Sequence, residues 1–291
     1  MAHRSGFVNI LGNPNVGKST IMNALVGEKL SIITSKSQTT RHRILGIVNG
    51  EDFQIVYSDT PGILKPAYKL QEAMMKSVST AISDADIIVY VTDVNEKIDK
   101  NRATLERIRE SGVPIIMVIN KIDLGNQSKL DSIYDKCSSL IPEALIIPLS
   151  AKEGFNIENL LKHIIDRLPE APPYFPKDQL TDRYERFFVK EIIREKILTN
   201  YKKEVPYSVE IEIDTYNEEN NIVKIRAIIH VTRNSQKGII IGHQGKMLKK
   251  TGTESRQDIE EFIGKKVFLE LYVKVSKDWR DKPGSLKKFG Y

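Results

Sequence analysis

Residues 12–19 read Gly-Asn-Pro-Asn-Val-Gly-Lys-Ser and directly follow the apolar run 7–11. A helical pattern with apolar residues at Ile21 and Leu25 comes next, so the glycines occupy a turn between a strand and a helix. This is the setting of a phosphate-binding loop, because converging backbone N–H groups and the helix N-terminus attract an anion. We expect Lys18 to reach the β- and γ-phosphates and the Ser19 hydroxyl to bind Mg²⁺. An accidental match in an ordinary turn is the alternative.

Apolar runs and helical patterns alternate up to about residue 168. Several runs lack a period-2 alternation, which is typical of strands buried on both faces. The predicted fold class is α/β, a doubly wound and mostly parallel sheet whose ligand site lies at the carboxyl ends of its strands. The predicted strands are 7–11, 44–48, 53–57, 87–91, 115–119 and 145–149, and the predicted helices are 17–27, 70–83, 100–110, 128–140 and 156–167.

Two further segments complete a site for phosphate and Mg²⁺. Residues 59–62 read Asp-Thr-Pro-Gly at the end of the third predicted strand. There Asp59 can hold Mg²⁺ through a water, and the Gly62 N–H can sense a γ-phosphate. The loop after the first predicted helix contains Thr39 and Thr40, either of which offers a hydroxyl to Mg²⁺ and the γ-phosphate.

Two segments at later strand ends identify the base. Residues 120–123 read Asn-Lys-Ile-Asp, and the Asp123 carboxylate can accept from two adjacent N–H donors of guanine, a pairing that adenine cannot offer. Residues 150–152 read Ser-Ala-Lys, where the Ala151 N–H can donate to the guanine carbonyl oxygen. Each segment alone is typical of an ordinary loop. Together with the phosphate segments, in order at successive strand ends, they predict a guanine-nucleotide site.

The predicted nucleotide-binding set extends over all these segments. Asn120 is expected to bond the base and the loop, and the Lys121 stem to lie over the ring. The residues are Gly12, Asn13, Pro14, Asn15, Val16, Gly17, Lys18, Ser19, Thr20, Asp59, Thr60, Pro61, Gly62, Asn120, Lys121, Asp123, Ser150, Ala151 and Lys152.

Hydrolysis is expected to be slow. Gly62 is followed by Ile63, where a Ras-like GTPase carries a glutamine that orients the attacking water. An isoleucine cannot do this by hydrogen bonding, and no arginine stands out as a finger. Asn15 has two interpretations: a turn residue, or a ligand for a monovalent cation beside the phosphates.

The length of 291 residues favours two domains, and the proline-rich stretch 168–176 separates them. We expect a GTP-binding domain at 1–170, a linker at 171–181 and a second domain at 182–291. Residues 1–173 contain 20 Lys and Arg against 20 Asp and Glu, so the whole net charge of +6 lies beyond them. The second domain is therefore expected to meet a polyanion, although a chance excess on a solvated surface gives the same count.

Other features of the composition exclude whole classes of protein. The single cysteine, Cys137, excludes an intrachain disulfide and fits a reducing cytosol. No apolar run is long enough for a membrane span, and no signal-peptide core is present. The five histidines show no metal-ligand spacing.

The second domain has an α-β-β-α-β pattern, with a helix at about 182–201 and strands at about 209–214, 223–231 and 267–275. Residues 242–245 read Gly-His-Gln-Gly between the apolar run 239–241 and a helix, which is the setting of a KH module. A short helix before the glycines and another at the C-terminus are also expected.

The glycines would let the backbone of a single-stranded RNA approach closely, with the apolar run under the bases and lysines facing phosphates. A Gly-x-x-Gly alone is typical of any tight turn. The residues predicted to bind RNA are Ile240, Ile241, Gly242, His243, Gln244, Gly245, Lys246, Lys249 and Lys250.

Over nearly all its length the chain resembles the Era family of two-domain bacterial GTPases, in the TrmE–Era–EngA group. Besides the nucleotide motifs, the resemblance rests on six segments. They are Gln38-Thr39-Thr40-Arg41-His42-Arg43, Phe175-Pro176, Thr181-Asp182, Glu191-Ile192-Ile193-Arg194-Glu195-Lys196, Val205-Pro206-Tyr207-Ser208 and Leu271-Tyr272-Val273-Lys274-Val275.

The resemblance implies a P-loop GTPase domain followed by a smaller α+β domain, a type II KH module that grips the 3′ end of 16S rRNA during maturation of the small (30S) ribosomal subunit. It implies that GTP favours RNA binding, that Thr40 is the Mg²⁺ ligand of the two threonines, and that Asn15 helps to bind K⁺. The residues expected to act in hydrolysis are Lys18, Thr40 and Gly62, and those at Mg²⁺ are Ser19, Thr40 and Asp59.

We therefore expect a cytoplasmic monomer with GTP or GDP and Mg²⁺ as ligands, no DNA partner, and weak peripheral association with the inner face of the cell membrane. Two alternatives stay open. One is an RNA-binding scaffold with a structural, slowly hydrolysed nucleotide. The other, a membrane-surface GTPase, rests only on the positive second half of the chain.

Overall fold

The computed structural model describes residues 2–96 and 98–291, and its contacts divide the chain into two compact units. The first unit contains the residues up to Lys65 together with Ala73–Asp182. The second contains Pro66–Glu72 together with Arg183–Tyr291. No helix among the described residues is both long and apolar enough to cross a membrane.

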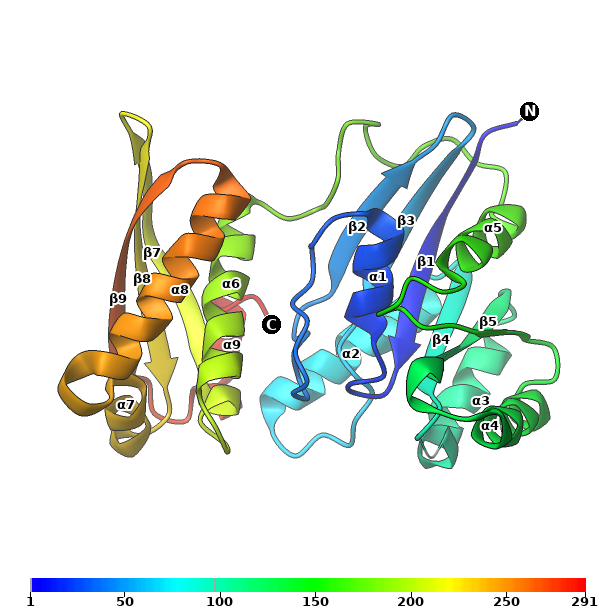
Figure 1. The fold of residues 1–291 in the computed structure, drawn as a ribbon, viewed down its shortest axis with the longest axis horizontal. Helices are drawn as coiled ribbons and strands as arrows, with labels where there is room; N and C mark the ends of the chain where they lie inside the picture. Colours follow the sequence, from blue (N-terminus) through cyan, green and yellow to red (C-terminus); the bar gives the residue numbers. More distant parts are fainter. Residues whose placement is uncertain (1, 97) are drawn as a thin grey trace. The chain divides into compact units, whose positions relative to one another are not determined.

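The first unit is built on a six-stranded sheet in the order β2-β3-β1-β4-β5-β6 (Figure 1). All neighbouring strands run parallel except β2, which is antiparallel to β3. This confirms the predicted doubly wound, mostly parallel sheet. The strands are β1 (Arg4–Gly12), β2 (Ile44–Asn49), β3 (Phe53–Asp59), β4 (Ile87–Asp93), β5 (Ile115–Asn120) and β6 (Leu145–Pro148).

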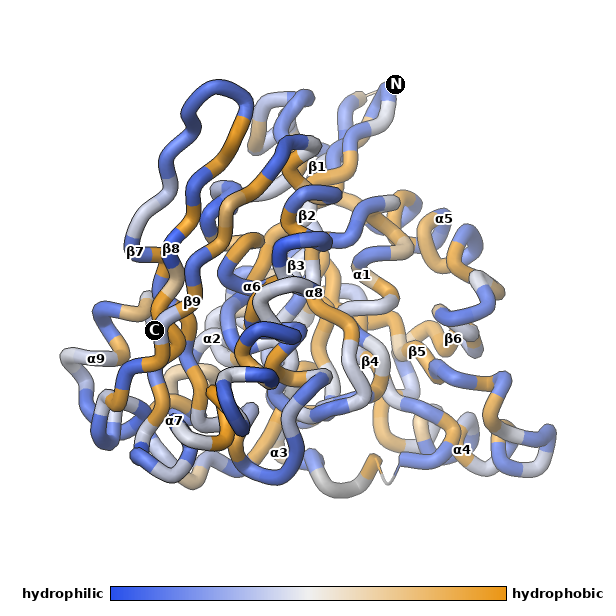
Figure 2. Tube along the Cα trace, turned by 60° about the vertical axis from the view of Figure 1, so that its left-hand side comes forward, coloured by the Kyte–Doolittle hydropathy of each residue, from blue (hydrophilic) through white to orange (hydrophobic). Residues whose placement is uncertain are grey.

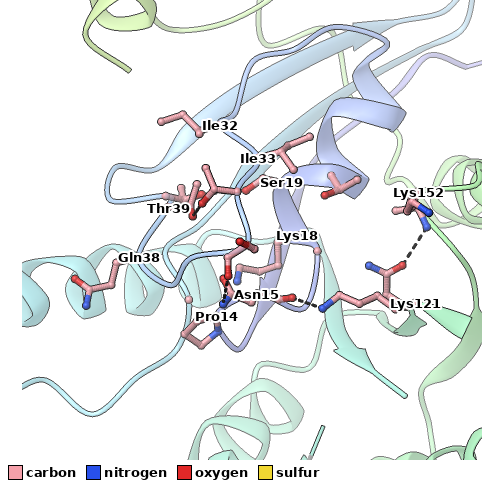
Figure 3. Close-up of a pocket in the computed structure, with 18 of the residues that line it drawn as sticks. Pro14, Asn15, Lys18, Ser19, Ile32, Ile33, Gln38, Thr39, Lys121 and Lys152 are labelled. Carbon is pink, nitrogen blue, oxygen red and sulfur yellow. Dashed lines mark hydrogen bonds between the residues drawn. The ribbon is translucent and has the colours of Figure 1, made fainter. Parts of the chain in front are cut away.

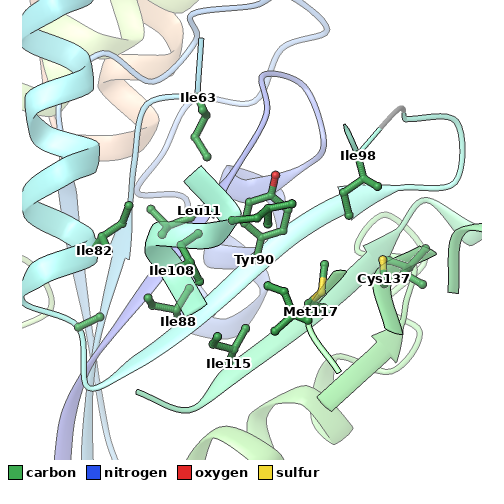
Figure 4. Close-up of a cluster of buried hydrophobic side chains, with 14 of the residues drawn as sticks. Leu11, Ile63, Ile82, Ile88, Tyr90, Ile98, Ile108, Ile115, Met117 and Cys137 are labelled. Atoms are coloured by element: carbon green, nitrogen blue, oxygen red, sulfur yellow. The ribbon is translucent and has the colours of Figure 1, made fainter. Parts of the chain in front are cut away.

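Helices pack on both faces of this sheet, which explains why its central strands carry runs of consecutive apolar residues, such as 87–91 and 115–119. The side chains of Ile88 and Tyr90 enter a buried cluster with α2, α3 and α4, whereas Ile87 and Val89 are buried on the other face (Figure 4). The predicted helix 100–110 begins as a 3₁₀ turn, Ile98–Asn101. The helices are α1 (Lys18–Val26), α2 (Lys69–Ser83), α3 (Arg102–Glu110), α4 (Gln127–Leu140) and α5 (Ile157–Arg167).

The second unit is a three-stranded sheet in the order β7-β8-β9, with β8 antiparallel to β7 and parallel to β9. Helices α6 and α8 lie on one face of it (Figure 1). This is the predicted KH arrangement, including the short helix before the glycine pair. The elements are α6 (Glu185–Asn200), β7 (Glu210–Glu219), β8 (Ile222–Val231), α7 (Asn234–Ile241), α8 (Lys246–Ile263), β9 (Lys266–Val275) and α9 (Pro283–Lys288).

Strand β7 is longer than its alternating pattern predicts. Asn220 and Asn221 both have left-handed backbones, with φ of 48° and 64°, and form a tight hairpin turn. The turn keeps the polar residues before it paired to β8, so the hairpin extends as a hydrophilic tip (Figure 2).

The proline-rich segment is bound to the first unit rather than lying free. The buried amide of Gln54 accepts from the backbone N–H groups of Tyr174 and Phe175 at 2.7 and 3.0 Å. Its Nε2 donates to the Phe175 carbonyl at 2.8 Å. Further along, Thr181 Oγ1 donates to the Leu45 carbonyl at 2.7 Å. The segment thus follows the edge of the sheet formed by β2 and β3.

Replacing Gln54 should release this segment. Gln54→Ala leaves the backbone groups of Tyr174 and Phe175 without partners, so we expect a fall in unfolding free energy of about 1–3 kcal/mol. Limited proteolysis should then cut within residues 174–180 several-fold faster than in the wild type. Asn49→Ala is the control, because it removes the bond to the Lys177 carbonyl at 3.0 Å and one bond from Gln54 Nε2 at 2.8 Å but leaves both N–H bonds to Gln54 Oε1 in place. Equal cutting rates in Gln54→Ala and wild type would contradict the assignment.

Candidate functional site

A cavity of about 540 Å³ lies at the carboxyl ends of β1, β3 and β5 (Figure 3). Its volume is in the range of small-molecule sites. The lining residues come from five sequence regions: Pro14, Asn15, Gly17, Lys18, Ser19 and Thr20; Ile32, Ile33, Thr34, Ser35, Gln38, Thr39 and Thr40; Gly62; Asn120, Lys121, Asp123 and Leu124; and Ala151 and Lys152. Most of the predicted nucleotide-binding residues are therefore brought together.

Two glycines permit the shape of the phosphate loop. Gly12 and Gly17 have φ of 145° and 98°, which L side chains rarely adopt. A Cβ on Gly17 would also lie 2.2 Å from Nδ2 of Asn120. The loop therefore packs so closely against the end of β5 that only glycine fits.

Lys18 is buried beneath the loop and donates to the Asn13 carbonyl at 2.8 Å. Burial lowers the pKa of its ammonium to about 8, and attraction to Asp59 and Glu96 opposes that shift. Because this ammonium is largely removed from water, a bound phosphate would attract it more strongly than it would at the surface.

Three oxygen groups converge where Mg²⁺ is expected. Ser19 Oγ and Thr40 Oγ1 donate to Asp59 Oδ2 at 2.7 and 3.0 Å, and they lie 3.0 Å from each other. Asp59 Oδ1 is buried and has no hydrogen-bond partner among the described residues. Burial raises the pKa of Asp59, against the attraction of Lys18 and the hydroxyl bonds. A buried carboxylate beside two hydroxyls fits the hard-oxygen preference of Mg²⁺.

The structure also distinguishes the two threonines. Thr39 Oγ1 lies 2.8 Å from Thr34 Oγ1 and donates to the Lys36 carbonyl at 2.7 Å, within its own loop. Thr40 Oγ1 donates to Asp59 Oδ2. The choice of Thr40 as the Mg²⁺ ligand stays a prediction.

Gly62 lies against the phosphate loop. A Cβ at this position would be 2.7 Å from the backbone nitrogen of Pro14, so any side chain would push the two loops apart. The next residue, Ile63, donates its N–H to the Gly12 carbonyl at 3.1 Å. Its side chain is buried in the core cluster of Figure 4, so it cannot reach a water in the cavity.

Asn120 connects three loops at the base end of the cavity. Its Nδ2 donates to the Val16 carbonyl at 2.8 Å, and its Oδ1 accepts from the Ala151 N–H at 3.0 Å. Ser150 Oγ donates to Asp123 Oδ1 at 2.6 Å and so orients that carboxylate. The Ala151 N–H, predicted to donate to guanine, is used here to join the loops.

Asn15 and Lys121 meet above the loop (Figure 3). Both have left-handed backbones, with φ of 65° and 59°. Lys121 Nζ donates to the Asn15 carbonyl and lies 2.9 Å from Asp93 Oδ2. The side-chain nitrogen of Asn15 donates to the Ser35 carbonyl at 3.1 Å.

In the second unit, residues 242–245 form a tight turn between α7 and α8. Gly242 and Gly245 have φ of 71° and 75°. A Cβ on Gly245 would meet nothing within 4 Å, so this glycine leaves open space at the surface. The expectation that Ile240 touches a base is wrong, because its side chain is fully buried in the core and supports the loop from below.

A groove of about 470 Å³ starts at Gly245 and runs between α8 and β9. It contains Gly245 and Lys249 of the predicted set and other residues that were not predicted to bind RNA. Residues on α8 that follow Lys249 at helical spacing, such as Thr253 and Arg256, could have been predicted from the sequence. Phe268 could not, because it lies on β9. The additional residues are Leu248, Gly252, Thr253, Arg256, Phe268, Leu269 and Leu271.

Comparison with known proteins finds relatives of both units. A family model described as a 50S ribosome-binding GTPase matches residues 7–121, and a KH domain model matches residues 204–280. GTPase Era of Alkaliphilus metalliredigens is 45% identical over 100% of both chains. GTPase Era of Staphylococcus haemolyticus is 43% identical over 99% of this chain and 97% of its own.

Two solved structures are similar over 99% of both chains at 38% identity. One is a variant of Era from Aquifex aeolicus bound to GDP and AlF₄⁻, with a TM-score of 0.94. The other is Era in complex with MgGDPNP and nucleotides 1506–1542 of 16S ribosomal RNA, with a TM-score of 0.95. On this full-length similarity, and on the nucleotide cavity and KH module described above, the chain belongs to the Era family of GTPases.

Proposed function

We propose that this GTPase is a nucleotide-controlled RNA-binding factor that grips the 3′ end of 16S rRNA and assists assembly of the small ribosomal subunit. The GTP-binding domain is assigned to residues 1–170, the linker to 171–181 and the RNA-binding domain to 182–291. The observation that carries the proposal is the groove beside Gly245, on the part of the chain that holds the whole net charge of +6.

The groove has the chemistry that single-stranded RNA requires. Lys249 and Arg256 supply positive charge for phosphates, and Phe268 supplies an exposed ring on which a base can stack. The open space at Gly245 lets a sugar–phosphate backbone approach. The related Era structure with a 16S rRNA fragment supports the same class of RNA.

At the nucleotide site, each group of the chain has a distinct task. Lys18 and the loop N–H groups hold the phosphates, while Ser19, Thr40 and Asp59 would hold Mg²⁺, which supplies charge stabilisation to the β- and γ-phosphates. Gly62 would read the γ-phosphate through its N–H. Since Ile63 cannot orient a water, positioning and charge are left to carry the reaction, so turnover should be slow.

Both GTP and ribosomal RNA occur in the cytoplasm, so that location is proposed too. The weak association with the inner face of the membrane stays a prediction.

The proposal is tested by titrating an oligonucleotide of the rRNA 3′ end with protein loaded with a GTP analogue or with GDP. We expect binding that is about tenfold or more tighter with the GTP analogue, since ligand coupling typically spans about 5- to 150-fold. Gly245→Asp should weaken RNA binding by adding a negative charge where a phosphate passes, and leave nucleotide affinity unchanged.

Gly264→Asp is the matched control, because that glycine also has a left-handed backbone, with φ of 73°, a Cβ there also meets nothing within 4 Å, and the charge change is identical. Equal and weak binding in both nucleotide states, or equal losses in the two variants, would refute the proposal.

Asn15 is proposed as a K⁺ ligand. Its left-handed backbone holds the side chain at the mouth of the phosphate site, where a cation could take the place of an arginine finger. Phosphate release should be about tenfold faster in K⁺ than in Na⁺, and Asn15→Ala should abolish the difference. Asn221→Ala, at φ of 64° in the hairpin of the second unit, controls for the strain of alanine in this conformation. Equal rates in the two salts would rule K⁺ out.

Lys18 should give nucleotide affinity a pH dependence. Its pKa in the empty site is about 8, and bound phosphate raises it because negative charge favours the ammonium. Binding therefore takes up a proton above pH 8, and affinity falls as pH rises, by up to about tenfold per unit. Calorimetry in two buffers of different ionisation enthalpy should show proton uptake growing from about pH 7.5 to about pH 8.5. Constant uptake across this range would contradict the shifted pKa.

A further inference from the structure

The side chain of Asn13 is bonded outside the nucleotide cavity. Asn13 belongs to the phosphate loop, yet it does not line the cavity and is nearly buried. Its Nδ2 donates to Glu96 Oε1, and its Oδ1 accepts from Nδ2 of Asn101. Both partners come from the segment that follows β4. These bonds therefore connect the phosphate loop, which follows β1, to the segment after β4.

Glu96 is itself held in place. Its second oxygen, Oε2, accepts from Thr92 Oγ1 at 2.7 Å, and its backbone N–H donates to the Asp93 carbonyl at 3.0 Å. Burial raises the pKa of this carboxyl group, and the bonds from Thr92 and Asn13 oppose that shift. A carboxyl group that is partly removed from water and bonded at both oxygens has a single favourable position.

The connection continues to the phosphate-binding lysine. The backbone carbonyl of Asn13 accepts from Lys18 Nζ at 2.8 Å, so whatever fixes Asn13 also fixes the resting position of that ammonium. We propose that Glu96 is a positioning residue for GTP and GDP binding, which acts by holding the Asn13 amide and thereby the first turn of the phosphate loop. The role rests on the nucleotide site described above but not on RNA binding.

The position of this contact predicts which nucleotides and which kinetic constants it affects. Asn13 and Lys18 belong to the part of the loop that surrounds the β-phosphate, which GDP and GTP share, and Lys18 also reaches the γ-phosphate of GTP. Loss of the Glu96 contact should therefore weaken both nucleotides, and GTP at least as much as GDP. It should raise KM much more than it lowers kcat, because ground-state and transition-state binding suffer together.

Exchanging the two polar groups tests the contact directly. Asn13→Asp places two carboxylates against each other, and it should weaken both nucleotides by about 10- to 100-fold. Glu96→Gln alone should cost a few-fold. In the double variant, the amide introduced at position 96 can donate to the carboxylate introduced at position 13, while Thr92 and Asn101 keep their donor roles. The double variant should therefore bind both nucleotides at least about fivefold more tightly than Asn13→Asp.

Fluorescent GDP and GTP analogues give the affinities, and steady-state phosphate release gives kcat and KM. Glu106→Gln, an exposed carboxylate on α3, is the control for loss of a charge. Should Asn13→Asp fail to fold, Asn13→Ala and Glu96→Ala form a second cycle, whose combined loss should be smaller than the product of the single losses. The proposal would be overturned if the double variant bound nucleotide as weakly as Asn13→Asp. It would also be overturned if the losses of the two alanine variants multiplied in their double variant, or if only GTP binding were weakened.

Discussion

The hydrogen bonds from the Ser19 and Thr40 hydroxyls to one buried oxygen of Asp59 hold the nucleotide site together. They join the start of α1, the loop before β2 and the end of β3 at one point. A buried carboxylate costs free energy unless it is paired, so this arrangement favours a cation. Lys18 attracts the Asp59 carboxylate, and Mg²⁺ would add a second positive charge beside it. The loops that surround the phosphates are therefore organised around one carboxylate.

What is decided locally could be predicted from the sequence. The glycine-rich turn, the buried strands and the residues at successive strand ends follow from short-range sterics and from burial on two faces. Asp59 was expected at Mg²⁺ because the end of β3 must lie beside the phosphate loop in such a sheet. The guanine segment at 120–123 was predicted for the same reason, and the KH module from strand alternation and its glycine pair.

Long-range contacts between polar side chains could not be predicted. Nothing in the sequence pairs Asn13 with Glu96, since both belong to loops whose approach depends on the whole sheet. The prolines predict a linker, but they do not predict that Gln54, a residue of β3, binds its backbone. Ile240 was placed under the bases, whereas the turn of α7 directs it into the core. Phe268 lines the groove because β9 pairs with β8, and the sequence does not predict that pairing.

The central claim is that one ligand controls the binding of another. Gly62, which we propose reads the γ-phosphate, lies against the phosphate loop, and the chain continues from it into residues 66–72, which group with the second unit. Coupling of this kind is reciprocal. If GTP, relative to GDP, tightens RNA binding, RNA must tighten the binding of GTP relative to GDP by the same factor. The most direct test measures the affinities for a GTP analogue and for GDP with and without the 16S rRNA 3′-end oligonucleotide. The account predicts that saturating RNA raises the preference for the GTP analogue by about tenfold or more. An unchanged ratio of the two affinities would contradict it.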